Sequence, residues 1–322
     1  MRKSQFIENG TFFKGNIHSH TTRSDGFYAP AKLVEMYKER GYSFLVLSDH
    51  EKFFDSTEFD DPGFLVYPGL EWSAKHLNKP DQWNDLQGLF VGTLSDHFRE
   101  EQKWGHDQYL ESVSGHSHRA VQRAIDCLRE AGHLSIYNHP RISRVEPEEI
   151  LGLEGLFALE IYNHKSEVYC GNGTATFYWD WLLRKGKRLY GVADDDNHNQ
   201  EAGNRTRDSF GGWIMVKARE LSRSALAEAL IQGSFYSSTG PEIYEYGIDD
   251  GMIKIVTSPV QSIRFITDGS FGQNWTAEDG TSLTEASYSL TGKEVYVRVE
   301  CMDAHGKVAW SNPIFEENLP GL

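Results

Sequence analysis

The chain has 322 residues, of which 39% are hydrophobic and 13% aromatic, so it can bury a large core and is not disordered throughout. Its formal net charge of −15 argues against a partner of duplex nucleic acid, because phosphate-backbone binding needs clustered Lys and Arg. No stretch approaches the roughly 20 apolar residues of a membrane span, and no apolar signal-peptide segment follows the first residues. We therefore expect a cytoplasmic protein without a membrane partner, although a removed signal peptide would leave no trace.

The first three quarters of the chain alternate short apolar strands with amphipathic helices. Strands are expected at 16–20, 44–48, 64–69, 133–138, 156–163, 188–193, 213–218 and 235–239, and helices at 30–41, 117–131, 174–186 and 222–233. The strand "FLVLS" (44–48) is almost wholly apolar, as is typical of a strand buried on both faces of a parallel sheet. Repeated βα units of this length predict an α/β fold whose seven or so strands close into a barrel.

The pattern changes after "STGPEI". From Ile243 onward no helical period is visible, and "IKIVTS", "SIRFITDG" and "EVYVRVECMD" alternate apolar and polar residues between turn signals. This predicts two domains, a barrel over residues 1–240 and a small all-β, sandwich-like domain over 241–322. The second is expected to pack against the barrel or to mediate assembly into a homo-oligomer.

Ionisable residues gather where the predicted strands end, which is where α/β sheets and barrels carry their sites. "NIHSH" contains two histidines one residue apart, which would project from one side of a strand. An isolated pair of this kind is easily a coincidence of loop composition, but five strand ends present His, Asp or Glu. Imidazole and carboxylate together suit zinc, manganese or iron, so the sequence predicts a site for several metal ions.

At this point the motifs resemble a known family. "IHSHTTRSDG", "LSDH", "GLEWS", "YNHPR" and "DNH" look like the successive ligand motifs of the PHP (polymerase and histidinol phosphatase) superfamily of metal-dependent phosphoesterases. The order matches, and the resemblance covers residues 16 to about 240. It implies a distorted seven-stranded βα barrel.

The resemblance also implies a centre of two or three divalent transition metals (zinc, manganese or iron). His18, His20, Glu71 and Asp196 would hold the first ion, and Asp25, His50 and His198 another. Glu71 would bridge to a middle ion that His139 also binds. These eight residues are the expected ligands.

The sequence departs from the family pattern at the middle ion, which usually receives one more histidine from the strand after the glutamate. "DLQGLFVGT" contains none, and Gln87 is expected to be its polar residue nearest the site. The candidates to replace the missing histidine from a loop are His76, His97, His116 and His118. Without one, the middle ion is weakly held, absent or completed by water.

Arg23 and Arg141, each close in sequence to an expected ligand, are candidates to neutralise a phosphoryl group, although either is equally an ordinary surface arginine. His164, Arg205 and Arg207 are weaker candidates from loops on the same rim. Asp194 and Asp195 either orient the histidines or are solvated loop carboxylates; the sequence leaves both open.

The resulting expectation is a phosphoesterase that hydrolyses a small phosphorylated substrate, a metabolite or nucleotide, with a metal-bound hydroxide. An alternative is a metal-dependent hydrolase of C–N or C–O bonds, because similar barrels hold similar metals. A third is a degenerate barrel that binds a ligand or partner, which near-complete retention of the ligand motifs disfavours.

Overall fold

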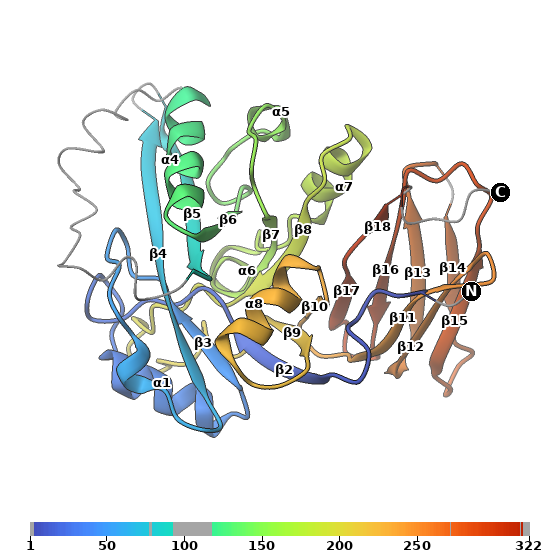
Figure 1. Cartoon of the computed structure of the whole chain (residues 1–322), viewed down its shortest axis with the longest axis horizontal. Helices are drawn as coiled ribbons and strands as arrows, with labels where there is room; N and C mark the ends of the chain where they lie inside the picture. Colours follow the sequence, from blue (N-terminus) through green and yellow to red (C-terminus); the bar gives the residue numbers. More distant parts are fainter. Residues whose placement is uncertain (1–2, 77–78, 93–117, 271, 316, 318–322) are drawn as a thin grey trace.

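The computed structural model describes residues 3–76, 79–92, 118–270, 272–315 and 317, and Figure 1 shows two lobes side by side. In the first lobe seven strands follow one another across a sheet in sequence order. They are β2 (Thr11–Asn16), β3 (Phe44–Leu47), β4 (Leu65–His76), β5 (Lys79–Phe90), β6 (His133–Tyr137), β7 (Ala158–Asn163) and β8 (Tyr190–Asp194). The expected mixed α/β architecture is confirmed.

The strand directions differ from a uniform βα series. β2, β3 and β4 are mutually parallel, as are β6, β7 and β8, but β5 is antiparallel to both of its neighbours, β4 and β6. β4 and β5 are 12-residue strands that follow each other with only residues 77 and 78 between them. That connection is too short for a crossover helix, so the chain turns back as an antiparallel ribbon.

The two outer strands of this series approach each other just beyond their ends. Ser19 and Asn197 form an isolated parallel bridge, the His20 amide donates to the Asn197 carbonyl at 3.1 Å, and the Asp196 amide donates to the His18 carbonyl at 3.0 Å. These bonds bring the segments after β2 and β8 together. A closed seven-stranded barrel stays a prediction, since no ladder joins β2 to β8 among the strands described.

The helices are α1 (Pro30–Glu39), α4 (His118–Glu130), α5 (Pro147–Leu151), α6 (His164–Cys170), α7 (Thr176–Arg184) and α8 (Arg223–Ile231), with a 3-10 turn, η1, at Thr57–Phe59. Four of them, α1, α4, α7 and α8, lie where the apolar periodicity placed them, whereas α5 and α6 were not predicted. α4 buries the expected face, which comprises Ala120, Val121, Ala124, Ile125 and Leu128. None of the helices in the described ranges is long and apolar enough to cross a membrane.

One boundary prediction was wrong in a way that matters for the site. The strand expected at 16–20 is displaced toward the N-terminus, because β2 runs from Thr11 to Asn16 and pairs with β9 (Trp213–Ala218) over Thr11–Gly15. His18 and His20 therefore lie just past the strand, in the extended segment that bridges to Asn197.

The second lobe is all β, as the alternation after residue 243 predicted, but its strands continue the first sheet. β9 pairs with β10 (Phe235–Ser238), which pairs with β17 (Val308–Ser311), followed by β16 (Tyr296–Met302), β13 (Ser262–Thr267) and β14 (Gln273–Thr276), while β18 (Ile314–Phe315) joins β16. A second antiparallel sheet comprises β1 (Lys3–Ser4), β11 (Ile243–Asp249), β12 (Met252–Val260) and β15 (Leu283–Ser289). The apolar core of this lobe includes Ile253, Ile255, Ile263, Phe265 and Val299. A domain boundary near residue 241 stays a prediction.

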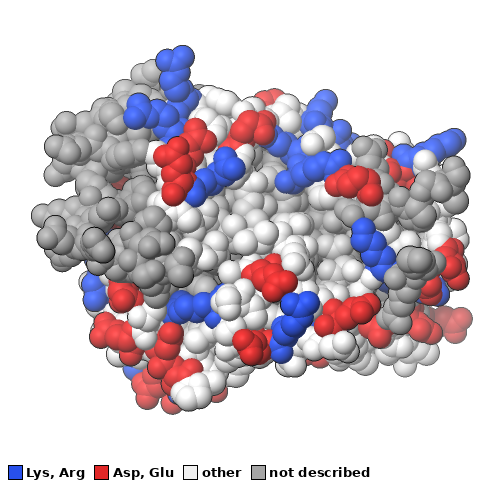
Figure 2. Space-filling view, viewed as in Figure 1, with Lys and Arg blue, Asp and Glu red and all other residues white. Residues whose placement is uncertain are grey.

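Surface charge is mixed on the face drawn in Figure 2, where acidic and basic side chains lie interspersed around a central uncharged region.

A buried ion pair connects the two lobes. Arg298 on β16 is fully buried and donates from Nε and Nη2 to the two carboxylate oxygens of Asp180 on α7, at 2.7 and 2.6 Å. Its Nη1 donates to Glu300 at 2.8 Å, and its guanidinium lies 4.8 Å from the Trp179 ring centre. Removing the Asp180 charge would leave the guanidinium buried with half of its partners.

We expect Asp180→Asn to lower the free energy of unfolding by roughly 2 to 4 kcal/mol, somewhat below the loss from a fully buried pair, because the Asp180 side chain is 26% exposed. Denaturant unfolding measures the loss. Lys32→Gln is the matched control: it breaks a solvent-exposed pair with Glu35, and exposed pairs contribute little to stability. Equal losses in the two variants would contradict the buried anchor.

Candidate metal centre

The structure brings all eight expected ligands into one cluster, which is buried apart from the half-exposed Asp25 and the partly exposed His50. They come from the segment after β2, the loop beyond it, the ends of β3, β6 and β8, and the middle of β4, and they are His18, His20, Asp25, His50, Glu71, His139, Asp196 and His198. The residues that follow β3, β6 and β8 lie close together because these parallel strands end at the same edge of the sheet.

Glu71 occupies the middle of this cluster. Its Oε2 lies 3.3 Å from His18 Nε2 and 3.2 Å from His20 Nε2. The same oxygen is 3.2 Å from His50 Nδ1, while Oε1 is 3.2 Å from His139 Nε2. One carboxylate thus faces four imidazoles, an arrangement suited to bridging two ions.

Asp196, in the segment after β8, belongs to the same cluster. Its Oδ1 lies 3.2 Å from His20 Nε2 and 3.5 Å from His18 Nε2, so the implied first set of four ligands is assembled. Asp196 adopts a left-handed φ of 50°, which is unusual for a residue other than glycine. Such backbone strain is typical of positions that the surrounding structure fixes for a function.

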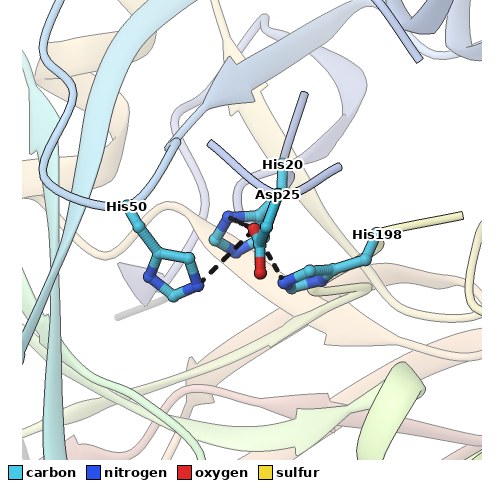
Figure 3. A group of neighbouring side chains, drawn as sticks. All are labelled: His20, Asp25, His50 and His198. Carbon is cyan, nitrogen blue, oxygen red and sulfur yellow. Dashed lines mark ion pairs between the residues drawn. The ribbon is translucent and has the colours of Figure 1, made fainter. Parts of the chain in front are cut away.

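A second group lies toward the outside and is drawn in Figure 3. Asp25 Oδ1 lies 3.3 Å from His198 Nε2, 3.8 Å from His50 Nε2 and 3.8 Å from His20 Nδ1. His20 Nδ1 is buried and has no hydrogen-bond partner, although it points toward this group. An imidazole nitrogen without a partner among four ligand-type side chains fits a bound cation, so the residues present suit a metal ion here.

The sequence reasoning missed two carboxylates of the cluster. Asp85 on β5 groups with Glu71 and His139, and Glu160 on β7 groups with His18 and His139. Asp85 lies within the very segment that lacks the expected histidine, and its acidic side chain was the signal that could have found it. Gln87, expected to be the polar residue nearest the site, instead donates its amide to the Ile17 carbonyl.

The histidine substitutes proposed for the middle ion do not enter the described cluster. His118 is exposed at the start of α4, with its ring beside Gly152. His97 and His116 lie outside the described residues, as does the side chain of His76.

Several ligand side chains are held by a second hydrogen bond behind them. His18 Nδ1 lies 3.0 Å from Glu160 Oε2, and His139 Nδ1 lies 3.0 Å from the Ser143 hydroxyl. The amides of Asn138 and Asn163 donate to Glu71 and Asp196, respectively, at 2.8 and 3.1 Å. Partners of this kind fix the ring orientation and the tautomer of a metal-binding histidine.

Asp194 and Asp195 are both buried, so the interpretation as solvated loop carboxylates was wrong. Asp195 accepts hydrogen bonds from the Tyr37 hydroxyl at 2.6 Å and from the backbone amides of 210, 211 and 212 at 2.8 to 2.9 Å. It therefore organises the loop after β8. Asp194 Oδ1 lies 3.7 Å from His18 Nδ1, on the same side as Glu160.

The protonation of the imidazoles follows their surroundings. Burial lowers the pKa of His50 to about 4, so this ring is neutral at pH 7 and free to bind a cation. Burial also acts to lower the pKa of His18 and His139, but nearby carboxylates outweigh it. Glu71 and Asp196 raise the pKa of His18 well above its usual value, and Glu160 and Glu71 raise that of His139 to about 9. Without a metal, the cluster holds protons that an incoming ion must displace.

All five residues predicted to act on the substrate, Arg205 and Arg207 included, lie outside the groups of ligands. The Arg23 guanidinium lies over the Phe54 ring at 3.8 Å, and Arg141 donates to the Thr174 carbonyl at 2.8 Å. The His164 ring packs over Gly211, with Nδ1 3.1 Å from the Tyr162 hydroxyl. Their catalytic roles stay predictions.

A cation that the sequence did not single out reaches the cluster. Lys165 on α6 places Nζ 3.0 Å from His198 Nδ1 and 3.6 Å from Asp196 Oδ2, with a side chain that is 32% exposed. Its position two residues after Asn163, at the end of a strand, was the only sequence signal.

Comparison with known proteins finds no family model and no curated sequence that matches the chain. Among solved structures, it is similar to a two-domain protein containing a predicted PHP-like metal-dependent phosphoesterase from Bacteroides vulgatus, with 13% identity and a TM-score of 0.48 over 99% of this chain and 90% of the other. It is also similar to an amidohydrolase from Chromobacterium violaceum, solved with sulfate and no metal, with 14% identity and a TM-score of 0.40 over 57% of this chain and 87% of the other.

We expect Glu160→Gln to weaken binding of the first metal ion by about 10- to 100-fold, because His18 loses its carboxylate partner while every ligand remains. Competition against a chromophoric chelator, with zinc as the probe, measures the affinity. Glu154→Gln, at a side chain that is 82% exposed, is the control and should bind zinc like the unmodified protein. Unchanged affinity in Glu160→Gln would refute the orienting role.

Proposed function

We propose that this chain is a metal-dependent phosphoesterase that hydrolyses a phosphate ester of a small metabolite or nucleotide with two or three divalent transition metals. The observation that carries the proposal is the shared cluster around Glu71 and Asp196, in which the Glu71 carboxylate belongs to two groups of ligand-type side chains and can bridge two ions. Adjacent groups with a common member suit adjacent ions, which phosphoesterases use to hold both the attacking and the leaving oxygen.

The donor set supports divalent transition metals. The outer group offers three imidazoles and one carboxylate, and the first set offers two of each. Mixed nitrogen and oxygen donors suit zinc, manganese or iron. When bound, such ions supply activated water and neutralise the charge on phosphoryl oxygens.

The protein's own residues would orient and hold the substrate. Glu160 and Ser143 fix the rings of His18 and His139, so the ligands are preorganised before substrate arrives. Lys165 lies at the edge of the cluster, half-buried, and is the best-placed cation to receive a phosphoryl oxygen. Arg23 and Arg141 are further candidates on neighbouring loops, and each would have to leave its present partner.

A phosphate-release screen over nucleotides and sugar phosphates tests the activity, with the protein reconstituted with zinc or manganese. We expect at least one substrate to be turned over, and His18→Ala and Asp196→Asn to lower kcat/KM at least about 100-fold, because metal-derived stabilisation amounts to several kcal/mol. His305→Ala, which removes an exposed histidine of the second lobe, is the matched control.

Two outcomes would contradict the phosphoesterase proposal. One is less than one equivalent of transition metal after reconstitution, with no phosphate released from any substrate. The other is hydrolysis of amides or esters of carboxylic acids in a parallel screen while phosphate esters stay intact, which would favour a C–N or C–O hydrolase.

We expect Lys165→Met to lower kcat/KM for the phosphorylated substrate by about 10- to 100-fold, since a charged hydrogen bond to the substrate contributes roughly 1.5–3 kcal/mol. Metal content, measured by elemental analysis, should be unchanged. Lys254→Met removes an exposed lysine paired with Asp249 and serves as the control. Loss of activity only in proportion to loss of metal would assign Lys165 a structural part in the metal site instead.

A further inference from the structure

Asp85 is a buried carboxylate with one oxygen that nothing satisfies. It lies on β5 opposite Ser73 of β4, and its side chain is almost fully enclosed. Its Oδ1 has no hydrogen-bond partner, and its Oδ2 lies 3.7 Å from His139 Nδ1. A buried carboxylate oxygen without a partner costs free energy, so such a group calls for a proton or a cation.

The surroundings of Asp85 supply further ligand atoms. Glu71 and His139 each offer a donor atom within 4.8 Å of an Asp85 oxygen and of each other, so the three form a further group that shares Glu71 with the first set of four. The group is anchored by backbone pairing, since the Asn138 amide just before His139 donates to the Asp85 carbonyl at 3.0 Å. β5 and the end of β6 therefore hold Asp85 and His139 side by side.

We propose that Asp85 is a ligand of a third divalent ion, which it binds together with Glu71 and His139 in place of the histidine that the sequence lacks. The inference rests on the proposed function, because Glu71 is shared with the neighbouring ions. Asp85 thus completes the position that a loop histidine or water was expected to fill.

The change of ligand alters the metal preference of this position. Two carboxylates and one imidazole make a donor set richer in oxygen than the outer group, which has three imidazoles and one carboxylate. Oxygen donors favour manganese or magnesium, whereas imidazoles favour zinc. We therefore expect a mixed centre in which zinc occupies the imidazole-rich positions and manganese binds beside Asp85.

The test begins with the whole protein stripped by a chelator and reconstituted with zinc and manganese together. Elemental analysis counts both metals, and electron paramagnetic resonance reports bound manganese. The unmodified protein should retain about one equivalent of manganese beside its zinc. Asp85→Asn should lose that manganese and keep the zinc, and Asp126→Asn on α4 should behave like the unmodified protein.

Asp85→His is the second variant and keeps the test decisive if Asp85→Asn folds poorly. Restoring an imidazole should exchange the manganese for about one more equivalent of zinc. Manganese retained unchanged in either variant would overturn the proposal and leave Asp85 as a group that only orients the His139 ring. Absence of a manganese equivalent in the unmodified protein would overturn it as well.

The failure of this inference is distinguishable from failure of the phosphoesterase proposal. If the metal content changes in the Asp85 variants as described but no substrate releases phosphate, Asp85 is a ligand and the proposed activity is wrong. If phosphate is released but the metal content is the same in the Asp85 variants, the activity is supported and the proposed ligand is wrong.

Discussion

Negative charge concentrated inside the protein, which needs protons or cations beside it, is the constraint on which the rest of the structure depends. Glu71, Asp196, Asp85 and Glu160 are all buried within one cluster, where they face imidazoles instead of arginines. Isolated buried carboxylates are costly, and without a metal ion the protons held by His18 and His139 offset only part of their charge. Lys165 reaches the edge of the cluster but is a single ammonium. A site built in this way is stable only with protons or metal ions, and metal ions fit its donor atoms best.

The backbone around the cluster is organised to hold these groups despite that cost. Asp49 accepts hydrogen bonds from the backbone amides and hydroxyls of Thr21 and Ser24, at 2.7 to 3.0 Å, which fixes the loop that carries Asp25. Asp195 does the same for the loop after β8 through Tyr37 and three backbone amides. These two carboxylates are fully engaged with neutral donors, so they shape the site without competing for its cation.

The second lobe also supports the metal site through β8, although it contributes no ligand among the residues described. Asn312 accepts a hydrogen bond from the Gly191 amide at 3.1 Å and donates to the Phe235 carbonyl at 2.9 Å. Ser237 donates to the Gly191 carbonyl at 2.8 Å, and Trp310 stacks on Tyr162 with ring centres 5.8 Å apart. The strands that lead to Asp196 and Asn163 are thereby held by residues of the second lobe, which ties the geometry of the site to the packing of the two lobes.

The sequence predicted the ligands that lie in short recognisable motifs, and missed those that depend on strand pairing. The spacing of His18 and His20 was enough to predict them as ligands, even though the strand was misplaced, because an extended segment keeps alternate side chains on one side. Asp85 enters the site only because β5 runs antiparallel between β4 and β6, a pairing that the expected βα series did not contain. Lys165 could likewise not be predicted from the sequence, because it lies beside His198 only once α6 has folded. Local spacing can be read along the chain, whereas contacts across strands require the register.

The position of Lys165 bears on which bond the site would cleave. A C–N or C–O hydrolase acts on a neutral carbonyl, for which the metal ions alone can supply the positive charge. A phosphate monoester brings up to two negative charges, so it needs more positive charge than a neutral carbonyl does. An ammonium beside Asp196 and His198, still partly open to solvent, is an additional cation on the side from which a substrate must approach. This extra cation is why we favour phosphate over carboxylic esters or amides as the substrate, and why replacing Lys165 should separate the two classes of reaction more sharply than replacing any metal ligand.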